Sequence, residues 1–310
     1  MINKIYNLWE LKLPLIKRNV CPACLKSNFK IIFSLFYRDE KLSSFLKSYY
    51  GNRIELDKIK NNKYTLLECI NCSLIFQEEI PSNIFSNILY EDLIDTEISF
   101  NKKNNFEIKY KKKLSYEVKL INNIFKKDPN FIHILEFGAG WGYWSKYMQE
   151  KGFNISAFEI SENRINFMKK NNIKVINKLD NPNDKFDLIY SEETFEHISN
   201  PRETLLAMSK LLKDNGFILL RFPSNFLFKS KLNSDYRPKA DCAHPLEHIN
   251  LFKKKSFEFM LKNTDLKIIT LKSKINFSLI QVLKDFKNFF YFDNILLRKN
   301  NNLTRKNISL

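Results

Sequence analysis

The sequence predicts an α/β protein, in which a doubly wound parallel sheet is preceded by a small module with two cysteine pairs. Residues 131–160 show the order strand, glycine-rich turn, helix, strand and acid. Strand-like and helix-like stretches then alternate as far as residue 222, which is typical of a parallel sheet covered by helices. The two Cys-x-x-Cys pairs lie before this pattern and indicate a separate metal-binding module.

The central unit begins with an apolar run, residues 131–137, which we interpret as a buried strand ending in Gly138-Ala139-Gly140-Trp141-Gly142. A helix over 141–151 and a second strand over 153–158 follow, and Glu159 stands at the tip of that strand. Glycines let the backbone turn sharply and let a ligand approach it closely. A carboxylate at the strand tip can accept hydrogen bonds from ribose hydroxyls. This order opens a Rossmann-like domain and predicts a nucleoside-bearing ligand.

Four of the five cysteines form two pairs, Cys21-Pro22-Ala23-Cys24 and Cys69-Ile70-Asn71-Cys72. Each pair lets two sulfurs reach one ion from a tight turn, so together they can present four thiolates to a tetrahedral Zn²⁺. Four buried thiols would leave the pairing unexplained, and neither pair opens a βαβ unit as a thioredoxin-like redox motif does. With no open ligand position in the pattern, we predict a structural zinc-ribbon module.

The remaining elements follow from apolar periodicity. Residues 100–128 are predicted to form a helix that lies over the sheet. After Glu159 we expect helix 163–171, strands 173–176 and 186–190, helix 201–213, strand 217–222, a helix from 257 and a strand from 266. Phe and Leu interleaved with Lys near the end predict a helix packed on the body, or an interfacial helix, and then a polar tail. The chain is thereby divided into a lead segment and zinc-binding module (1–80), a helical link (81–130), a Rossmann-like domain (131–282) and a basic C-terminal tail (283–310).

The chain has 310 residues and a formal net charge of +17. Such an excess can indicate a nucleic acid, an anionic membrane or an acidic substrate. The Lys residues are dispersed among Asn and Ile, however, as a biased codon usage would also produce. No stretch approaches the ~18 consecutive apolar residues of a transmembrane helix, and charges interrupt the N-terminal segment too often for a signal peptide. These features predict a cytoplasmic protein with reduced cysteines.

The segment Glu136-Phe137-Gly138-Ala139-Gly140-Trp141-Gly142 resembles the first motif of the class I S-adenosylmethionine-dependent methyltransferases, and Glu159 resembles their ribose-binding acid. Their cofactor has no pyrophosphate, so the third glycine of a dinucleotide fingerprint is not required. Ser191 and Glu192 would border the methionine end of the cofactor, and Asp180 or its neighbour would contact the adenine. The cofactor-binding residues that this resemblance implies are Glu136, Phe137, Gly138, Ala139, Gly140, Glu159, Ile160, Asp180, Ser191 and Glu192.

A subgroup of this family, which includes the deoxysugar C-methyltransferases, is similar in having a four-cysteine module, a helical link and then the methyltransferase domain. The resemblance implies that Tyr90 of the link reaches the active site, that His248 is the base and that Glu247 supports it. The chain departs from the pattern at Pro245, where those enzymes place a tyrosine, and it lacks the length for their C-terminal domain. The Glu-His pair that ends in His197 is expected to fix a loop rather than to react.

These observations favour an enzyme that transfers a methyl group from S-adenosylmethionine to a small molecule or sugar, as in surface-glycan or secondary-metabolite biosynthesis, with structural Zn²⁺. The alternative is an RNA methyltransferase whose zinc module and basic surface grip the phosphate backbone. No aromatic-basic RNA motif accompanies the charge, so nucleic acid is not the favoured partner. A third possibility is a domain that binds the cofactor without catalysis, against which the intact Gly138, Gly140 and Glu159 argue.

Overall fold

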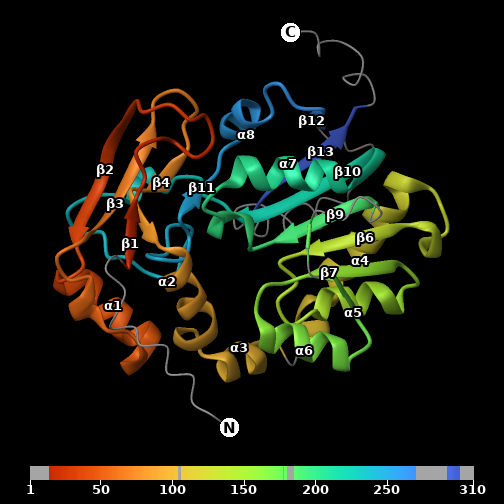
Figure 1. Cartoon of the computed structure of the whole chain (residues 1–310), viewed down its shortest axis with the longest axis horizontal. Helices are drawn as coiled ribbons and strands as arrows, with labels where there is room; N and C mark the ends of the chain where they lie inside the picture. The colour runs from red at the N-terminus through yellow and green to blue at the C-terminus, as the bar shows by residue number, and fades with distance from the viewer. Residues whose placement is uncertain (1–13, 104–105, 177, 180–184, 270–291, 301–310) are drawn as a thin grey trace.

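The computed structural model describes residues 14–103, 106–176, 178–179, 185–269 and 292–300. A four-stranded sheet in the N-terminal module and a seven-stranded sheet beyond it lie side by side (Figure 1), and a third sheet has two strands, at residues 15–17 and 79–81. The helices are α1 (Glu40–Tyr50), α2 (Asn83–Ile88), α3 (Thr96–Lys103), α4 (Phe106–Phe125), α5 (Tyr143–Glu150), α6 (Glu162–Lys170), α7 (Pro201–Leu211) and α8 (Lys254–Met260). The strands are β1 (Leu15–Lys17), β2 (Phe29–Phe36), β3 (Lys63–Cys69), β4 (Ile75–Gln77), β5 (Glu79–Pro81), β6 (His133–Phe137), β7 (Asn154–Phe158), β8 (Lys174–Ile176), β9 (Phe186–Glu192), β10 (Leu212–Pro223), β11 (Asn250–Leu251), β12 (Leu266–Ile268) and β13 (Phe292–Lys299).

The large sheet has the order β12-β13-β10-β9-β6-β7-β8. Strands β6 to β10 pair in parallel, as the alternation of strands and helices predicted. Strand β13 is antiparallel to both of its neighbours, so the sheet is mixed rather than wholly parallel. The strand order reverses between β6 and β9, and the carboxyl ends of these two strands form the edge where such a sheet binds ligands.

Strand β13 corrects the prediction that residues 283–310 form a tail. Residues Phe292–Lys299 pair with β10 along seven positions, and Ile295, Leu296 and Leu297 are all buried. Three consecutive buried residues are typical of a strand that is covered on both faces. Because charged residues flank this short apolar run, it shows no periodicity from which a strand could be predicted. The predicted helix over the preceding segment falls mostly within 270–291, outside the described residues.

Helices cover both faces of the large sheet. Leu114 and Ile121 of α4 pack with Trp144 and Met148 of α5 on one face, as predicted, but the predicted range 100–128 holds the end of α3 and the whole of α4 instead of one helix. Helices α7 and α8 pack on the opposite face, in a cluster that also includes buried cysteines of the N-terminal module. The two parts therefore share one hydrophobic core. Within the described residues, no helix is long and apolar enough to cross a membrane.

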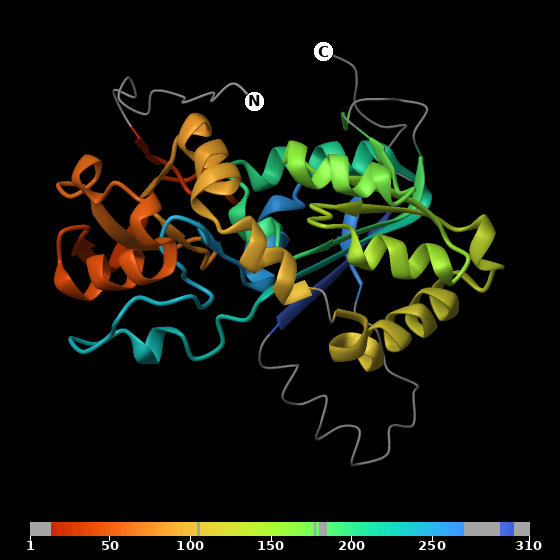
Figure 2. The ribbon, with the colours of Figure 1, turned by 90° about the horizontal axis from the view of Figure 1, so that it is seen from below.

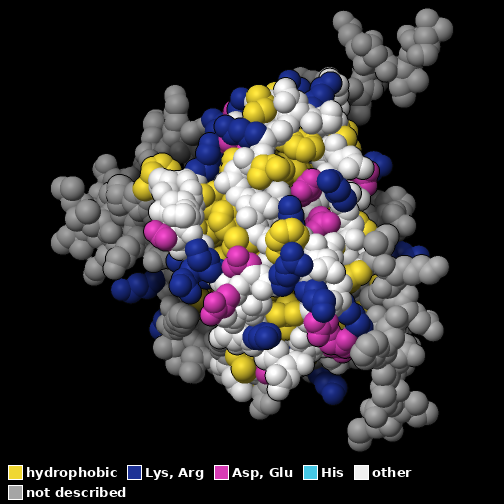
Figure 3. Space-filling view, turned by 90° about the vertical axis from the view of Figure 1, so that its left-hand side faces the viewer, with side chains coloured by type: hydrophobic (Ala, Val, Ile, Leu, Met, Phe, Trp, Pro, Cys, Tyr) yellow, Lys and Arg dark blue, Asp and Glu magenta, His cyan; other side chains and the backbone are white. Residues whose placement is uncertain are grey.

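The N-terminal module is not continuous in sequence. Its sheet has the order β11-β4-β3-β2, and β11 comes from a loop within residues 131–282, the range predicted to form the Rossmann-like domain. The side chain of Arg18 holds this loop, because it donates to the carbonyl oxygens of Gln77 (2.7 Å) and Ile249 (2.6 Å) and to Oδ1 of Asn250 (2.9 Å). Helices α2 and α3 connect the module to the large sheet (Figure 2). On the outer face of the module, Lys and Arg side chains are interspersed with Asp, Glu and hydrophobic groups (Figure 3).

Candidate active site at the edge of the sheet

The glycine-rich turn after β6 is held against the neighbouring strand. The N–H groups of Gly138 and Ala139 donate to the carbonyl of Phe158, at 2.8 and 3.1 Å. Gly138 has φ of +75°, and a Cβ there would lie 2.3 Å from the Thr194 side chain, so only glycine fits. Gly140 has φ of +56°, and a Cβ on it would meet nothing within 4 Å. The turn thus leaves open space in front of its backbone where a ligand can approach.

Glu159 is buried and oriented at the tip of β7. Its Oε2 accepts from the N–H of Gly140 (2.7 Å), and its Oε1 accepts from the N–H groups of Ile160 (2.8 Å) and Ser161 (3.1 Å). Arg164 adds a cation 3.9 Å from Oε2. Charge-assisted bonds of this kind fix the carboxylate at the edge of the open turn, where it can accept from a ribose diol. The exposed side chain of Ile160 lies beside it.

The other predicted cofactor residues take varied places. Glu136 is buried and accepts from the N–H (3.1 Å) and Oγ (2.5 Å) of Ser145, so its carboxylate anchors the start of α5. Phe137 is buried and stacks on Phe158. The Oγ of Ser191 is buried at the end of β9 without a hydrogen-bond partner among the described residues, so it can still accept or donate to a ligand. Asp180 lies outside the described residues.

Glu192 belongs to a buried charge cluster. Lys113 of α4 donates to both of its carboxylate oxygens, the Tyr190 hydroxyl donates to Oε2 (2.8 Å), and Arg221 lies 3.5 Å from Oε1. Arg221 also donates to Glu117 (2.5 Å). Burial opposes ionisation of Glu192, but Lys113 and Arg221 together lower its pKa below the ordinary value. The cluster therefore ties β9 and β10 to α4 behind the glycine-rich turn.

Replacing Arg221 with Leu should lower the free energy of unfolding by about 3–5 kcal/mol, because it leaves two buried carboxylates with only one cation. Urea denaturation would measure this loss. The matched control is Lys60→Leu, whose ion pair with Asp57 is exposed and should contribute less than about 1 kcal/mol. Equal, small effects of both substitutions would show that the cluster does not stabilise the fold.

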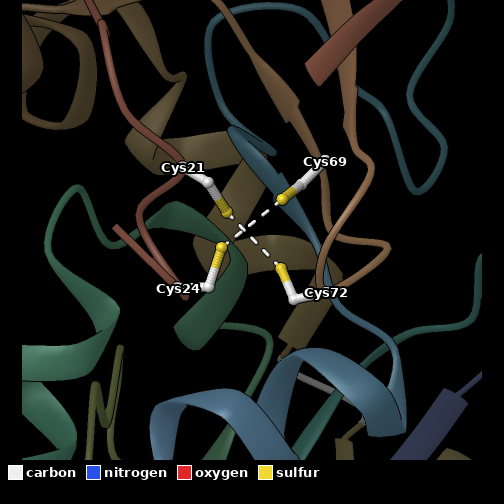
Figure 4. A group of neighbouring side chains, drawn as sticks. All are labelled: Cys21, Cys24, Cys69 and Cys72. Atoms are coloured by element: carbon white, nitrogen blue, oxygen red, sulfur yellow. Dashed lines mark hydrogen bonds between the residues drawn. The ribbon is translucent and has the colours of Figure 1, made fainter. Parts of the chain in front are cut away.

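The four paired cysteines meet at one point, as predicted (Figure 4). The Sγ atoms of Cys21 and Cys72 lie 3.5 Å apart, and those of Cys24 and Cys69 lie 3.4 Å apart. These distances exclude disulfide bonds. Four thiolates around a tetrahedral ion with Zn–S bonds of ≈ 2.3 Å would be about 3.8 Å apart. The arrangement therefore fits a structural zinc ion after a small expansion.

The second Cys-x-x-Cys pair sits in the turn between β3 and β4, and β4 ends at Gln77, which holds the loop before β11. The buried Gln77 amide donates to the carbonyls of His244 (3.0 Å) and His248 (3.1 Å), and its Oε1 accepts from the N–H of Leu246 (3.3 Å). The cysteine cluster, the β3–β4 hairpin and this loop thus form one connected unit.

His248 lies on that loop and faces the large sheet. Its Nδ1 is 2.5 Å from the carbonyl of Asp241, which can only accept, so Nδ1 carries the hydrogen and Nε2 keeps its lone pair. Burial, together with the neighbouring rings of His197 and His244, lowers the pKa of His248 to about 3. The imidazole is therefore neutral near pH 7, and the lone pair on Nε2 is free to accept a hydrogen bond or to bind a cation.

The side chain of Glu247 contacts Tyr50 and His244 instead of His248. Its Oε1 accepts from the Tyr50 hydroxyl of α1 (2.6 Å) and lies 3.4 Å from Nδ1 of His244. Burial opposes its ionisation, but these two neighbours hold its pKa at about 2. The His248 ring is held by the carbonyl of Asp241 and not by the Glu247 carboxylate, and the predicted support of His248 by Glu247 stays a prediction. The side chains of the consecutive residues Glu247 and His248 point in different directions. A sequence motif does not contain this information.

Tyr90 and His197 meet at the same site. Tyr90 lies in a π-helical turn, Leu89–Leu93, and its hydroxyl is 2.9 Å from Nδ1 of His197. That nitrogen is also 2.9 Å from the carbonyl of Glu247. The ring centroids of His197 and His248 are 4.9 Å apart. The sequence predicted only a loop-fixing role for His197 and did not indicate Tyr50 or His244, because the convergence of these residues depends on the packing of the module against the sheet.

Comparison with known proteins agrees with this geometry. Residues 107–271, more than half of the chain, match the protein family described as "Methyltransferase domain". The ubiquinone biosynthesis O-methyltransferase of Rickettsia bellii is 28% identical over 103 residues, which are 30% of this chain and 42% of the relative. The enzyme of the same name from Dechloromonas aromatica is 26% identical over 110 residues, or 31% and 47% of the two chains. The chain thus matches less than half the length of these curated relatives.

Solved structures of methyltransferases also give partial matches to this chain. The plantazolicin methyltransferase BpumL in complex with SAH is 21% identical, covers 69% of this chain and 93% of its own, and has a TM-score of 0.49. A methyltransferase from Clostridium acetobutylicum is 16% identical, covers 66% and 100%, and has a TM-score of 0.45. The family match, the glycine-rich turn and the oriented acid lead to one conclusion: the chain belongs to the methyltransferase-domain family.

Proposed function

We propose that this enzyme methylates a small molecule or sugar that binds between the N-terminal module and the carboxyl edge of the large sheet. The observation that carries the proposal is the convergence of His197, His248 and Tyr90, which come from three separate segments. Two of these segments approach from the module side, and His197 follows β9 beside the glycine-rich turn. The curated relatives, by their names, methylate a small molecule, which agrees with an acceptor of this class.

The residues that would hold the cofactor surround the turn. Glu159 would accept hydrogen bonds from the ribose hydroxyls of the cofactor, and Gly140 would leave room for the cofactor to approach. The buried Oγ of Ser191, which has no hydrogen-bond partner among the described residues, would bond to the methionine end of the cofactor. When bound, S-adenosylmethionine supplies a methyl group on a positively charged sulfur, so the carbon–sulfur bond breaks with its electron pair left on sulfur as the acceptor atom forms a bond to the methyl carbon. The protein has to align the acceptor and remove its proton.

We assign proton removal to His248 as general base. Its Nε2 lone pair is available because Nδ1 is committed to the carbonyl of Asp241. The acceptor's proton would move to Nε2, and the electron pair that it leaves on the acceptor would attack the methyl carbon. Glu247 would act indirectly, because its carboxylate holds His244 and Tyr50 while its carbonyl holds His197. Tyr90 would keep the His197 ring in place. The four cysteine sulfurs would hold Zn²⁺ as a structural ion.

His248→Ala should lower the turnover number by about 10²–10⁴-fold, since this is the usual contribution of a general base. Affinity for S-adenosylmethionine should stay the same, because Glu159 and the glycine-rich turn are untouched. Transfer of radiolabelled methyl groups to candidate acceptors would measure turnover, and calorimetry would measure cofactor affinity.

The matched control is His133→Ala, at the opposite end of β6, which should retain wild-type turnover. If His248→Ala turned over a true acceptor at the wild-type rate, the base assignment would be wrong. If it lost turnover and cofactor affinity together, the residue would support the fold rather than the proton transfer.

A further inference from the structure

Glu196 is a buried carboxylate beside the proposed acceptor site. Glu196 follows β9, in the 3₁₀ turn Phe195–His197, and is almost fully buried. Among the described residues, neither of its side-chain oxygens has a hydrogen-bond partner. A buried acid without a partner costs several kcal/mol, so such groups are retained where a ligand or an ion satisfies them.

The imidazole rings of His197 and His248 lie near this carboxylate. Nδ1 of His197 faces the carbonyl of Glu247, and Nδ1 of His248 faces that of Asp241, so each ring keeps its lone pair on Nε2. Nε2 of His197 is 3.9 Å from Oε1 of Glu196, too far for a hydrogen bond. Histidines that bind metals almost always donate their other ring N–H to a carbonyl or carboxylate, which is the arrangement here.

The distances suit a metal ion. Three potential ligand atoms lie within 4.8 Å of one another, one each from Glu196, His197 and His248. Ligands with bonds of ≈ 2.0–2.2 Å to a tetrahedral ion are about 3.4 Å apart, so small side-chain rotations would close the set. We propose that Glu196, His197 and His248 bind a divalent first-row transition-metal ion, separate from the cysteine cluster. Two imidazoles and one carboxylate favour such ions and leave coordination positions open.

The proposed metal site lies beside the glycine-rich turn, where a metal ion can take part in methyl transfer. Thr194, two residues before Glu196, packs against Gly138 of the cofactor turn, so the site adjoins the place where the methyl group would be presented. An ion with open positions would ligate an oxygen of the acceptor and help it to lose its proton. The inference rests on the proposed function and extends it to acceptors with a metal-binding oxygen. With the ion bound, Nε2 of His248 would be a ligand instead of the base; the ion would make the ligated hydroxyl of the acceptor more acidic, and the proton would pass to solvent water.

Titration with Mn²⁺, followed by the electron paramagnetic resonance signal of the free ion, tests the site without an acceptor. The full-length protein is first passed over a chelating resin, and its zinc content is measured before and after titration so that exchange at the cysteines is detected. The wild type should bind one Mn²⁺ per chain. Glu196→Gln and His248→Ala should bind at least about 100-fold more weakly, because loss of a partner outside the ligand set alone costs 10–100-fold.

Matched control variants distinguish the loss of a metal ligand from a loss of folding. Glu203→Gln removes an exposed carboxylate on α7, and His133→Ala removes a histidine away from the cluster, so both should bind Mn²⁺ as the wild type does. Unchanged affinity for S-adenosylmethionine would show that Glu196→Gln is folded, and His197→Gln is the substitute if it is not. No Mn²⁺ binding by the wild type, or equal binding by Glu196→Gln, would overturn the metal site and leave the methyltransferase assignment intact. Metal binding without cofactor binding would instead contradict the proposed function.

Discussion

Glu159→Ala should weaken S-adenosylmethionine binding by ~100-fold or more. Two hydrogen bonds from ribose hydroxyls to a carboxylate contribute about 1.5–3 kcal/mol each, and every 1.4 kcal/mol is a tenfold change in affinity. The substitution also frees three backbone N–H groups, of Gly140, Ile160 and Ser161, that the carboxylate now satisfies. Calorimetric titration of the purified protein would measure the change.

Glu162→Ala is the matched control, because this exposed acid lies in the first turn of α6, three residues away. It should bind the cofactor as the wild type does. Glu159→Gln keeps one acceptor oxygen and should bind with intermediate affinity, which distinguishes loss of ribose contacts from collapse of the turn. Wild-type affinity of Glu159→Ala would refute the assignment of this residue.

Cys69→Ser should release the metal and destabilise the N-terminal module. Apparent binding free energies of structural zinc sites reach about 10–16 kcal/mol, so loss of one thiolate should cost several kcal/mol of folding free energy. The effect should extend to catalysis, because Cys69 ends β3, and the β3–β4 hairpin carries Gln77, which holds the His248 loop. Zinc analysis by mass spectrometry and thermal unfolding would measure the two consequences.

Cys242→Ser is the control, since Cys242 is the one cysteine outside the cluster. It should keep one zinc ion per chain and wild-type turnover. A Cys69→Ser protein that retained zinc and unfolded at the wild-type temperature would contradict the structural role of the cluster. Wild-type protein that is folded but free of metal would contradict it as well.

The sequence predicted those parts of the molecule that depend on neighbours along the chain. The glycine-rich turn, the acid at the tip of β7 and the two cysteine pairs each lie within a few residues, and their backbone geometry follows from residue type. The alternation of strands and helices predicted the parallel part of the sheet for the same reason. The roles of Tyr90 and His248 stay predictions that the experiments above test.

The parts that could not be predicted depend on distant packing. Strand β13 inserts beside β10 because three buried residues fill both faces of the sheet, yet its short apolar run among charges has no periodicity of its own. The loop before β11 returns to the N-terminal module because Arg18 and Gln77 satisfy its carbonyls. This return brings His248 to His197, so the composition of the site follows from a contact that no local motif encodes.

The most direct test of the account is calorimetric titration of the folded protein with S-adenosylmethionine, with NAD as the control ligand. We expect one site per chain with micromolar affinity for S-adenosylmethionine and no binding of NAD, because Tyr143 stands where a dinucleotide fingerprint has its third glycine. Folded, zinc-loaded protein that bound neither ligand, or bound NAD equally well, would contradict the central claim.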